Sequence, residues 1–282
     1  MPFSLEPVTG TIGAEVTGLD LSQDLSEELA ADLRKALFAH QVLFLRDQHL
    51  DLNRQKQVTE LFGPLITLPY VVPTADDPFV IRVLKTAEER GGGVFGGNWH
   101  SDFSFVEAPP AGSVLSAVTL PPYGGDTVWA NMIAAYEALP GDLKGIVDGR
   151  GAIHSGKPYG VKHAPPPSAR SGASIQMTRD DPEADRERVK PAVLEHPESG
   201  RRSLFVNPTY TTRLDGMSEE ESAPILEALY KHCTRPEFCC RFRWSPGALV
   251  IWDNRTTMHY AVNDYDGFDR LLYRTAFGER AA

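Results

Sequence analysis

The first third of the chain alternates between helical and strand-like spacing of its apolar residues. Leucine recurs every fourth residue over 29–37, which predicts an amphipathic helix that begins after Ser26. The uninterrupted apolar run 42–45 predicts a short buried strand, and Asp51 is placed to cap a second helix that we expect to end near Gly63. The chain therefore opens as an α+β protein without the strand–helix–strand rhythm of a parallel sheet.

Short strands separated by proline and glycine turns dominate the rest of the chain. Residues 65–85 are strand-like but interrupted by prolines. Further strands are predicted over 98–105, 111–120, 126–129, 203–206, 238–244, 248–252 and 270–277. Asn131 is expected to cap a helix over 132–139, and Ser218 begins the capping-box sequence S-x-x-E ahead of another helix. This pattern is typical of an antiparallel barrel or double sheet with helices outside, and we expect one domain over 1–282.

Two segments break this pattern. Residues 155–200 hold a proline- and serine-rich stretch followed by a charged run, an insertion of the length that forms either a functional lid or a solvated surface loop. The sequence leaves these alternatives open. Residues 91–97 contain five glycines, but no Gly-Lys-Ser/Thr follows and a strand comes next, so we expect a flexible loop rather than a phosphate-binding loop.

Composition and charge narrow the classes of partner. The 282 residues carry a formal net charge of −10, which disfavours nucleic acid and anionic membranes as partners. Cys233, Cys239 and Cys240 lack the spacing of a disulfide framework or a zinc site, so we expect free thiols. The N-terminus shows no signal-peptide pattern, and no apolar run reaches the roughly 18 residues of a membrane span, so a cytoplasmic protein is expected.

His100 and Asp102 are the first candidates for chemistry. In the predicted strand 98–105 side chains at i and i+2 share a face, so an imidazole nitrogen and a carboxylate oxygen are expected to meet there. This donor pair suits a borderline metal such as Fe(II). H-x-D alone is a weak signal because it arises easily by chance. The third ligand is expected from a distant strand, and His259, shortly after the apolar run 248–252, is the best placed histidine.

Arg270 and Arg274 lie on one face of the predicted strand 270–277. Two guanidinium groups on a buried face are costly without anions, whereas on a solvent face they are ordinary. The residues around them are apolar on both faces, which favours a buried strand and therefore an anion-binding site.

These residues belong to a set of motifs that resembles a known family. The chain is similar to the Fe(II)/2-oxoglutarate-dependent dioxygenases of the taurine dioxygenase group, which includes alkylsulfatase-like and phenoxyacetate-degrading members. The motifs are I-G-A-E-V at 12–16, H-Q-V-L-F-L-R at 40–46, W-H-S-D at 99–102, G-G-D-T-V-W at 124–129, L-F-V-N at 204–207, I-W-D-N-R at 251–255 and the segment 259–274. The resemblance implies an α+β fold built on a double-stranded β-helix, or jelly-roll, barrel with flanking helices.

Carried over position by position, the resemblance implies roles for individual residues. It makes His100, Asp102 and His259 the iron ligands. Thr127 and Arg270 match the residues that hold the distal carboxylate of 2-oxoglutarate. The implied cofactors are therefore Fe(II), with 2-oxoglutarate and O2 as co-substrates.

The same comparison implies a pocket for an anionic substrate. Arg274 matches the arginine that binds the anionic group, and Phe103 and Tyr210 match residues that line the pocket. Three positions depart from the taurine enzymes, which carry histidine, tyrosine and asparagine there: Leu68, Val71 and Gly96. These changes predict a larger and more apolar pocket, which disfavours taurine itself and keeps an anionic substrate.

The implied reaction is hydroxylation of a C–H bond of a small anionic compound, with release of succinate and CO2. The substrate classes are a sulfonate, a sulfate ester or an aryloxy or carboxylic acid. Two alternatives remain: desaturation or epoxidation with the same cofactors in natural-product tailoring, or a barrel that binds a metal or anion without catalysis. The resemblance also implies a homo-oligomer, either a dimer or a tetramer.

Overall fold

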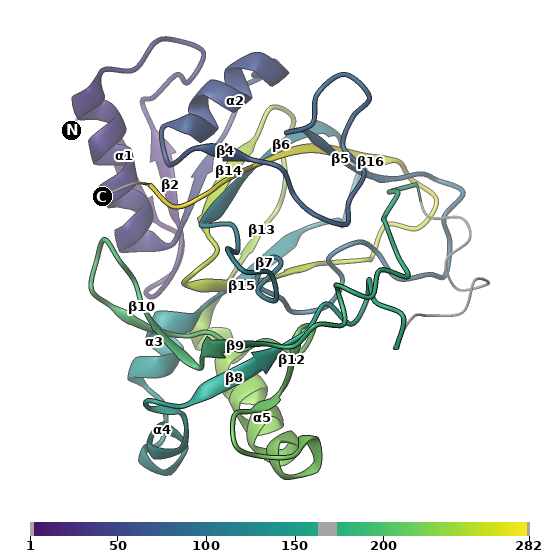
Figure 1. Ribbon diagram of the computed structural model, residues 1–282. Helices are drawn as coiled ribbons and strands as arrows, with labels where there is room; N and C mark the ends of the chain where they lie inside the picture. The colour runs from purple at the N-terminus through teal and green to yellow at the C-terminus, as the bar shows by residue number, and fades with distance from the viewer. Residues whose placement is uncertain (1–2, 163–173, 281–282) are drawn as a thin grey trace.

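A large, mainly antiparallel sheet forms the centre of the molecule. The computed structural model describes residues 3–162 and 174–280. The strand order is β1-β2-β3-β14-β6-β16-β4, and β5 pairs with β16 (Figure 1). The strands are β1 (Ser4–Pro7), β2 (Ala14–Thr17), β3 (Val42–Leu45), β4 (Leu65–Ile66), β5 (Ile81–Lys85), β6 (Gly112–Thr119), β14 (Leu249–Asp253) and β16 (Arg270–Phe277). The β2–β3 pair is parallel and the other pairs are antiparallel.

Three smaller antiparallel sheets complete the β structure. Their strand orders are β13-β7-β15, β12-β8-β9 and β10-β11. The strands are β7 (Thr127–Asn131), β8 (Gly151–His154), β9 (Arg188–Pro191), β10 (Val193–Glu195), β11 (Arg202–Leu204), β12 (Thr211–Leu214), β13 (Cys239–Phe242) and β15 (Thr257–Ala261).

An apolar layer joins the sheet β13-β7-β15 to the large sheet. Phe44 of β3 stacks on Phe242 of β13 with ring centroids 4.4 Å apart. Trp129 of β7 meets Trp252 of β14 edge to face at 6.0 Å. These side chains are almost fully buried, and aromatic pairs of this kind add roughly 0.5–1.5 kcal/mol beyond their burial. The two sheets therefore enclose a common interior.

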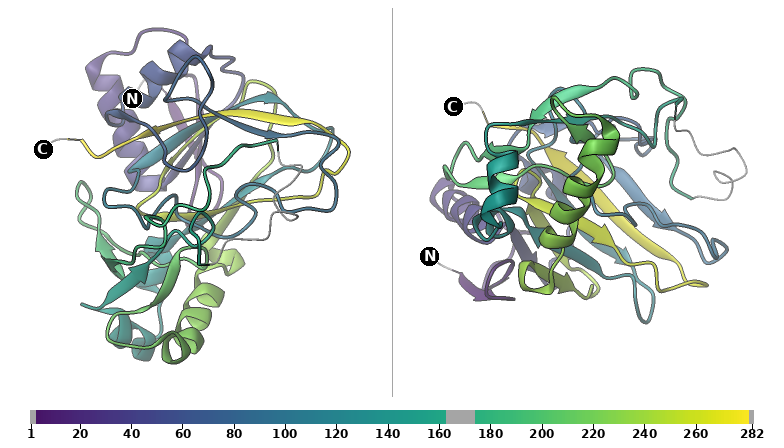
Figure 2. Two further views of the ribbon diagram at one scale, coloured as in Figure 1. Left: turned by 45° about the vertical axis from the view of Figure 1, so that its right-hand side comes forward. Right: turned by 90° about the horizontal axis from the view of Figure 1, so that it is seen from below.

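The helices pack outside the sheets in two groups. α1 (Glu27–His40) and α2 (Leu52–Glu60) contact strands of the large sheet. α3 (Met132–Glu137), α4 (Gly141–Val147), α5 (Glu219–Cys233) and the 3-10 helix η2 (Pro236–Phe238) lie on the other side, where α3 contacts α5 and β11. Figure 2 shows these two groups at opposite ends of the molecule. The prediction of an α+β protein with helices outside the sheets is confirmed.

The predicted helix starts are confirmed at the level of individual hydrogen bonds. Ser26 Oγ accepts from Leu29 N, and Asp51 Oδ1 accepts from Arg54 N. Asn131 caps α3, and Ser218 forms the predicted capping box of α5. These side chains satisfy backbone N–H groups that a helix leaves unpaired in its first turn.

The predicted strand over 98–105 is wrong. This segment turns, and its strand character is limited to an isolated bridge between His100 and His259. Phe103 has a left-handed φ of +45°, which a strand does not accommodate. The physical reason is a side chain 152 residues away: the amide of Asn254 hydrogen-bonds both the N–H and the carbonyl of Asp102, in place of a neighbouring strand.

The segment 155–200 is only partly irregular. β9 and β10 lie within it and pair with β8 and β11. Its residues 163–173 lie outside the described part of the chain. A lid function for this segment stays a prediction.

Two further sequence-based expectations can be compared with the structure. Cys233, Cys239 and Cys240 are free thiols, as predicted. No helix in the described ranges has the length and apolar character needed to cross a membrane.

The caps Ser218 and Asn131 differ in the number of groups they hydrogen-bond, so removing each should lower the free energy of unfolding by a different amount. Ser218→Ala is expected to lower the free energy of unfolding by about 1 kcal/mol, the usual contribution of an exposed cap. Asn131→Ala should cost roughly 2–4 kcal/mol, because Asn131 Nδ2 also donates to the Thr11 carbonyl and to Gln41 Oε1 in the interior. Urea denaturation of the two variants measures both values, and equal costs would contradict this account.

Candidate active site

Two histidines and one aspartate converge at one end of the interior. His100 Nε2 lies 3.5 Å from Asp102 Oδ1, and His259 Nε2 lies 3.7 Å from the same oxygen. The two imidazole rings are 4.1 Å apart, and one ligand atom from each residue falls within 4.8 Å of the others. Two imidazole nitrogens and one carboxylate oxygen form the donor set of non-haem Fe(II) oxygenases, so these residues fit such an ion.

Backbone hydrogen bonds hold the two histidines together. His100 N donates to the His259 carbonyl at 3.1 Å, and His259 N donates to the His100 carbonyl at 2.8 Å. His100 Nδ1 also lies 2.7 Å from the Asn98 carbonyl, which orients the ring so that Nε2 faces Asp102. Because His259 belongs to β15, the turn that carries His100 is fixed to the sheet.

The side chain of Asn254 fixes Asp102. Asp102 N donates to Asn254 Oδ1 at 2.6 Å, and Asn254 Nδ2 donates to the Asp102 carbonyl at 3.0 Å and to the Pro110 carbonyl at 2.9 Å. Asn254 is fully buried, so these bonds are not exchanged with solvent. They hold the Asp102 backbone in place although no strand pairs with it.

A buried ionic network supports the turn that presents Asn254. Asp253 accepts from Arg255 Nη2 at 2.6 Å and lies 2.9 Å from His196 Nε2. Arg255 Nη1 also donates to Glu198 at 2.9 Å. Burial disfavours ionisation of Asp253, but Arg255 and His196 outweigh it and lower its pKa to about 2. The Asp253 carboxylate therefore stays charged and pairs with Arg255, so the two residues that flank Asn254 hold each other in place.

Charges around Asp102 determine its protonation. Burial alone would raise its pKa, but the guanidinium of Arg274, which hydrogen-bonds Asp102 Oδ2, lowers it together with His259 and His100. Burial and the nearby His100 lower the pKa of His259 well below its ordinary value. An ionised carboxylate and a neutral imidazole are the forms that bind metals.

A narrow cavity of about 40 Å³ lies next to the cluster, between the two facing sheets. Its lining includes Thr127 of β7 together with Arg270 and Arg274 of β16. Both arginines are 3% exposed, which confirms that the face they share is buried. Arg270 forms no ion pair with a carboxylate in the part of the chain that the structure describes. A buried cation of this kind stabilises the fold only when an anion joins it.

The turn before β7 is shaped around Arg270. Arg270 Nε donates to the Gly125 carbonyl at 3.0 Å. Gly125 has a left-handed φ of +68°, and a Cβ there would lie 2.9 Å from Arg270 Cδ. Only glycine combines this backbone conformation with so close an approach. The G-G-D-T motif therefore places Thr127 and the Arg270 side chain at one cavity.

A second cavity, of about 160 Å³, also has His100 in its lining. Its lining includes Asp102 and the aromatic side chains of Phe103, Tyr159 and Tyr210, and we call it the aromatic cavity. The rings of Phe103 and Tyr159 stack at 6.0 Å, and those of Tyr159 and Tyr210 at 6.4 Å. The two cavities share His100, which places the cluster between them.

The remaining residues predicted for the substrate pocket lie at different depths. Gly96 lines both cavities, and a Cβ there would lie 3.4 Å from His100 Cε1. Leu68 and Val71 belong to the apolar cluster that includes Phe103 and Tyr210, but they do not line the aromatic cavity. Their side chains support the wall rather than form it.

Sequence reasoning missed three residues of this region: Asn254, Tyr159 and Arg179. Asn254 lies in the W-D-N-R motif, where an amide directly after a buried strand is a signal that could have been followed. Tyr159 and Arg179 lie in 155–200, whose composition gives no indication that they line a cavity with His100.

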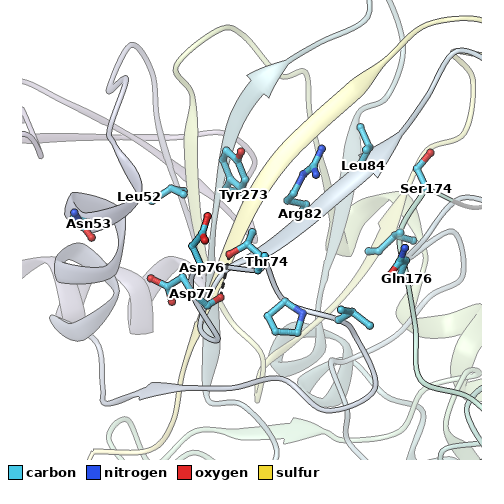
Figure 3. A pocket seen from close by; sticks show the side chains of 14 residues that line it. Leu52, Asn53, Thr74, Asp76, Asp77, Arg82, Leu84, Ser174, Gln176 and Tyr273 are labelled. Atoms are coloured by element: carbon cyan, nitrogen blue, oxygen red, sulfur yellow. Dashed lines mark hydrogen bonds between the residues drawn. The ribbon is translucent and has the colours of Figure 1, made fainter.

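Another cavity, of about 690 Å³, lies elsewhere (Figure 3). Tyr273 of β16 and Arg82 and Leu84 of β5 line it, with Asp76 and Asp77 opposite. Side chains alternate along a strand, so Tyr273 points to the face of β16 opposite to Arg274. This cavity therefore lies on the other face of the large sheet, and its lining does not include the cluster residues.

Comparison with known proteins assigns the family. The model of the family described as "Taurine catabolism dioxygenase TauD, TfdA family" matches residues 4–276. The chain belongs to this family. It is therefore a 2-oxoglutarate-dependent dioxygenase whose cofactor is Fe(II) and whose co-substrates are 2-oxoglutarate and O2. The predictions of family, reaction class and cofactors are confirmed.

Relatives of this dioxygenase match it along nearly its whole length. An alkylsulfatase of Acinetobacter baylyi is 38% identical over 98% of this chain and 86% of its own. An alpha-ketoglutarate-dependent sulfate ester dioxygenase of Pseudomonas putida is 36% identical over 99% of this chain and 91% of its own. A crystal structure of a taurine dioxygenase from Burkholderia xenovorans has a TM-score of 0.80 at 33% identity, covering 99% of this chain and 92% of the other.

Asn254 offers a direct test of how the cluster is held. Asn254→Ala removes both bonds to the Asp102 backbone, and we expect the affinity for Fe(II) to fall roughly 10–100-fold, as for other residues that orient metal ligands. Anaerobic titration with Fe(II), or with Co(II) as a probe, measures the dissociation constant. Asn53→Ala on the exposed face of α2 is the matched control and should leave it unchanged. Equal affinities in Asn254→Ala and the wild type would contradict the role of this side chain.

Proposed function

We propose that this dioxygenase hydroxylates the carbon next to the ester oxygen of a small organic sulfate. Arg270 is buried, has no carboxylate partner in the described chain and shares one cavity with Thr127 beside the metal cluster, which supports a site for 2-oxoglutarate there. The named activities of the relatives from Acinetobacter baylyi and Pseudomonas putida favour sulfate esters. Hydroxylation at that carbon would give a product that breaks down to an aldehyde and sulfate.

An aryloxy acid is the second candidate. The aromatic lining of Phe103, Tyr159 and Tyr210 suits a flat ring as well as an alkyl chain. A relative named (S)-phenoxypropionate/alpha-ketoglutarate-dioxygenase, from Sphingobium herbicidovorans, is 32% identical over 92% of this chain. A screen of sulfate esters, sulfonates and aryloxy acids for coupled succinate formation distinguishes the two candidates.

His100, Asp102 and His259 would hold the iron. When bound there, Fe(II) supplies the activation of O2 that is coupled to conversion of 2-oxoglutarate to succinate and CO2 and to oxidation of the substrate. The protein's part is to present two imidazoles and one carboxylate from a rigid frame. Asp102 also argues against halogenation, because a carboxylate ligand occupies the position that a halide would need.

Arg270 and Thr127 would bind the distal carboxylate of 2-oxoglutarate. Arg270 Nε donates to the Gly125 carbonyl, and the guanidinium lies beside the Tyr265 ring, so its terminal nitrogens would bind the carboxylate. Thr127 Oγ1 accepts from Trp244 Nε1 at 3.1 Å, so its own hydroxyl hydrogen is free to be donated. Charge-assisted bonds of this kind also relieve the cost of burying Arg270 alone.

Arg274 would bind the anionic group of the substrate. Its Nε and Nη2 are engaged with Ser113, and Nη2 also with Asp102, which leaves Nη1 without a hydrogen bond to the residues that the structure describes. Phe103 and Tyr210 would line the space for the carbon skeleton, with Gly96 at the junction of the cavities. Leu68 and Val71 would make the wall behind them apolar.

We also propose a barrel type, a cellular location and an oligomeric state for the enzyme. The face-to-face sheets around the cluster support a double-stranded β-helix, or jelly-roll, barrel. The net charge of −10 supports the absence of nucleic acid and membrane partners, and the free thiols support a cytoplasmic location. We further propose a dimer or tetramer, and a lid formed by about 155–200.

Removing a histidine or the aspartate of the cluster tests whether the cluster is the iron site. His100→Ala and Asp102→Ala are expected to abolish succinate formation that depends on the prime substrate, since each variant loses one of three ligands. The measurement is succinate by chromatography, with circular dichroism as the check of folding. Normal turnover in either variant would show that the metal binds elsewhere.

The two arginines of β16 should separate in their effects. Arg270→Ala is expected to raise the KM for 2-oxoglutarate roughly 10–100-fold, the usual worth of a charge-assisted contact, with a small effect on the KM for the prime substrate. Arg274→Ala is expected to raise the KM for the prime substrate instead. Steady-state kinetics with each substrate varied in turn gives both constants, and the reverse pattern would exchange the two roles.

A further inference from the structure

The aromatic cavity contains a cation that neither the metal cluster nor the 2-oxoglutarate site uses. Arg179 is the one lysine or arginine in its lining, as far as the described residues show. Its Nη1 donates to the Pro158 carbonyl at 2.5 Å, and its Nη2 lies 3.7 Å from Met177 Sδ. No carboxylate of the described residues pairs with it. A guanidinium has five N–H donors, so most of its donors remain for a ligand.

Backbone hydrogen bonds hold Arg179 at this cavity. On one side Thr178 N donates to the Tyr70 carbonyl at 2.9 Å, and on the other side Asp181 N donates to the Tyr159 carbonyl at 3.1 Å. Tyr70 and Tyr159 are themselves stacked with ring centroids 5.0 Å apart. Arg179 is thus placed by two anchored neighbours, which is unlike an arginine on a solvated loop.

Arg179 and Arg274 line different cavities beside the metal cluster. Arg274 lines the narrow cavity and not the aromatic cavity, whereas the reverse holds for Arg179. The two cavities meet at Phe95, Gly96 and His100. A substrate that reaches from one cation to the other therefore passes the cluster and has its carbon skeleton against Phe103 and the tyrosines.

We propose that Arg179 binds a second acidic group, at the end of the substrate remote from the reacting carbon. This inference rests on the proposed function, in which Arg274 binds the sulfate next to that carbon. The preferred substrate is then a dianion: a sulfate ester at one end, a short apolar chain against the aromatic rings, and a carboxylate or sulfonate at Arg179. A half-buried cation without an anionic partner among residues 3–162 and 174–280 favours such a ligand, because charge-assisted bonds are stronger than neutral ones.

Matched ligands that differ only in the remote group test this. The probes are butyl, hexyl and octyl sulfate and the ω-carboxylated form of each. Their dissociation constants are measured by calorimetry under argon with protein loaded with Fe(II) and 2-oxoglutarate, so that no turnover occurs. In the wild type, at least one ω-carboxylate is expected to bind about tenfold more tightly than its parent, which corresponds to one charge-assisted contact.

Substitution of the arginine links that preference to the residue. Arg179→Gln is expected to weaken the ω-carboxylate about tenfold and the parent sulfate less than about threefold, and Arg179→Lys to restore part of the difference. Arg186→Gln, an exposed arginine of the same segment, is the control and should change neither constant.

Each other outcome has a definite meaning. Equal losses for both probes in Arg179→Gln would show that Arg179 binds the sulfate itself and would overturn the second-anion inference. Unchanged affinity of Arg179→Gln for both probes would also overturn it. So would a wild-type protein that binds 2-oxoglutarate but none of the sulfate probes. Wild-type protein that fails to bind 2-oxoglutarate in the presence of Fe(II) would instead overturn the proposed function.

Discussion

A buried positive charge that needs an anion constrains the interior of this protein. Arg270 lies between the two facing sheets, almost fully buried, and forms no ion pair with the described carboxylates. Uncompensated burial of a guanidinium is costly, so such a residue is retained where a ligand completes the charge balance. A small carboxylate has room beside Arg270. The space is bordered by the glycine turn at 124–125, the short side chain of Thr127 and the facing tryptophans.

The strand that carries Arg270, β16, also contacts the metal cluster. Because side chains alternate along β16, Arg274 lies on the same inward face as Arg270, where it pairs with Asp102. Asp102 in turn faces both histidines. One strand therefore sets the distance between Arg270 and the cluster of His100, Asp102 and His259. The family's named cofactors fit the two halves of this arrangement.

The sequence predicted these inward residues because their signals are local. Period-2 spacing in an apolar strand was enough to place Arg270 and Arg274 on one buried face, and helix caps were readable from single residues. The predicted strand around His100 and Asp102 was wrong, because the amide of Asn254, 152 residues away, takes the place of a neighbouring strand. The W-D-N-R motif marks the amide, but no local pattern identifies Asp102 as its partner.

The aromatic cavity shows a second limit of sequence reasoning. Tyr159 and Arg179 come from a segment whose charge and proline content resemble a solvated surface. Their position depends on backbone bonds to Tyr70 and on stacking between distant rings, which are tertiary contacts. The motifs that carry the family resemblance include His100, Asp102 and His259, but none of them includes Tyr159 or Arg179.

We propose that this cluster and Arg270 together bind Fe(II) and 2-oxoglutarate at one site. Anaerobic addition of Fe(II) and then 2-oxoglutarate, followed by visible absorption, tests it most directly. The account predicts a charge-transfer band that appears only when both are present and saturates at one equivalent of each per chain. Absence of the band, or a band that is unchanged in Asp102→Ala, would contradict it.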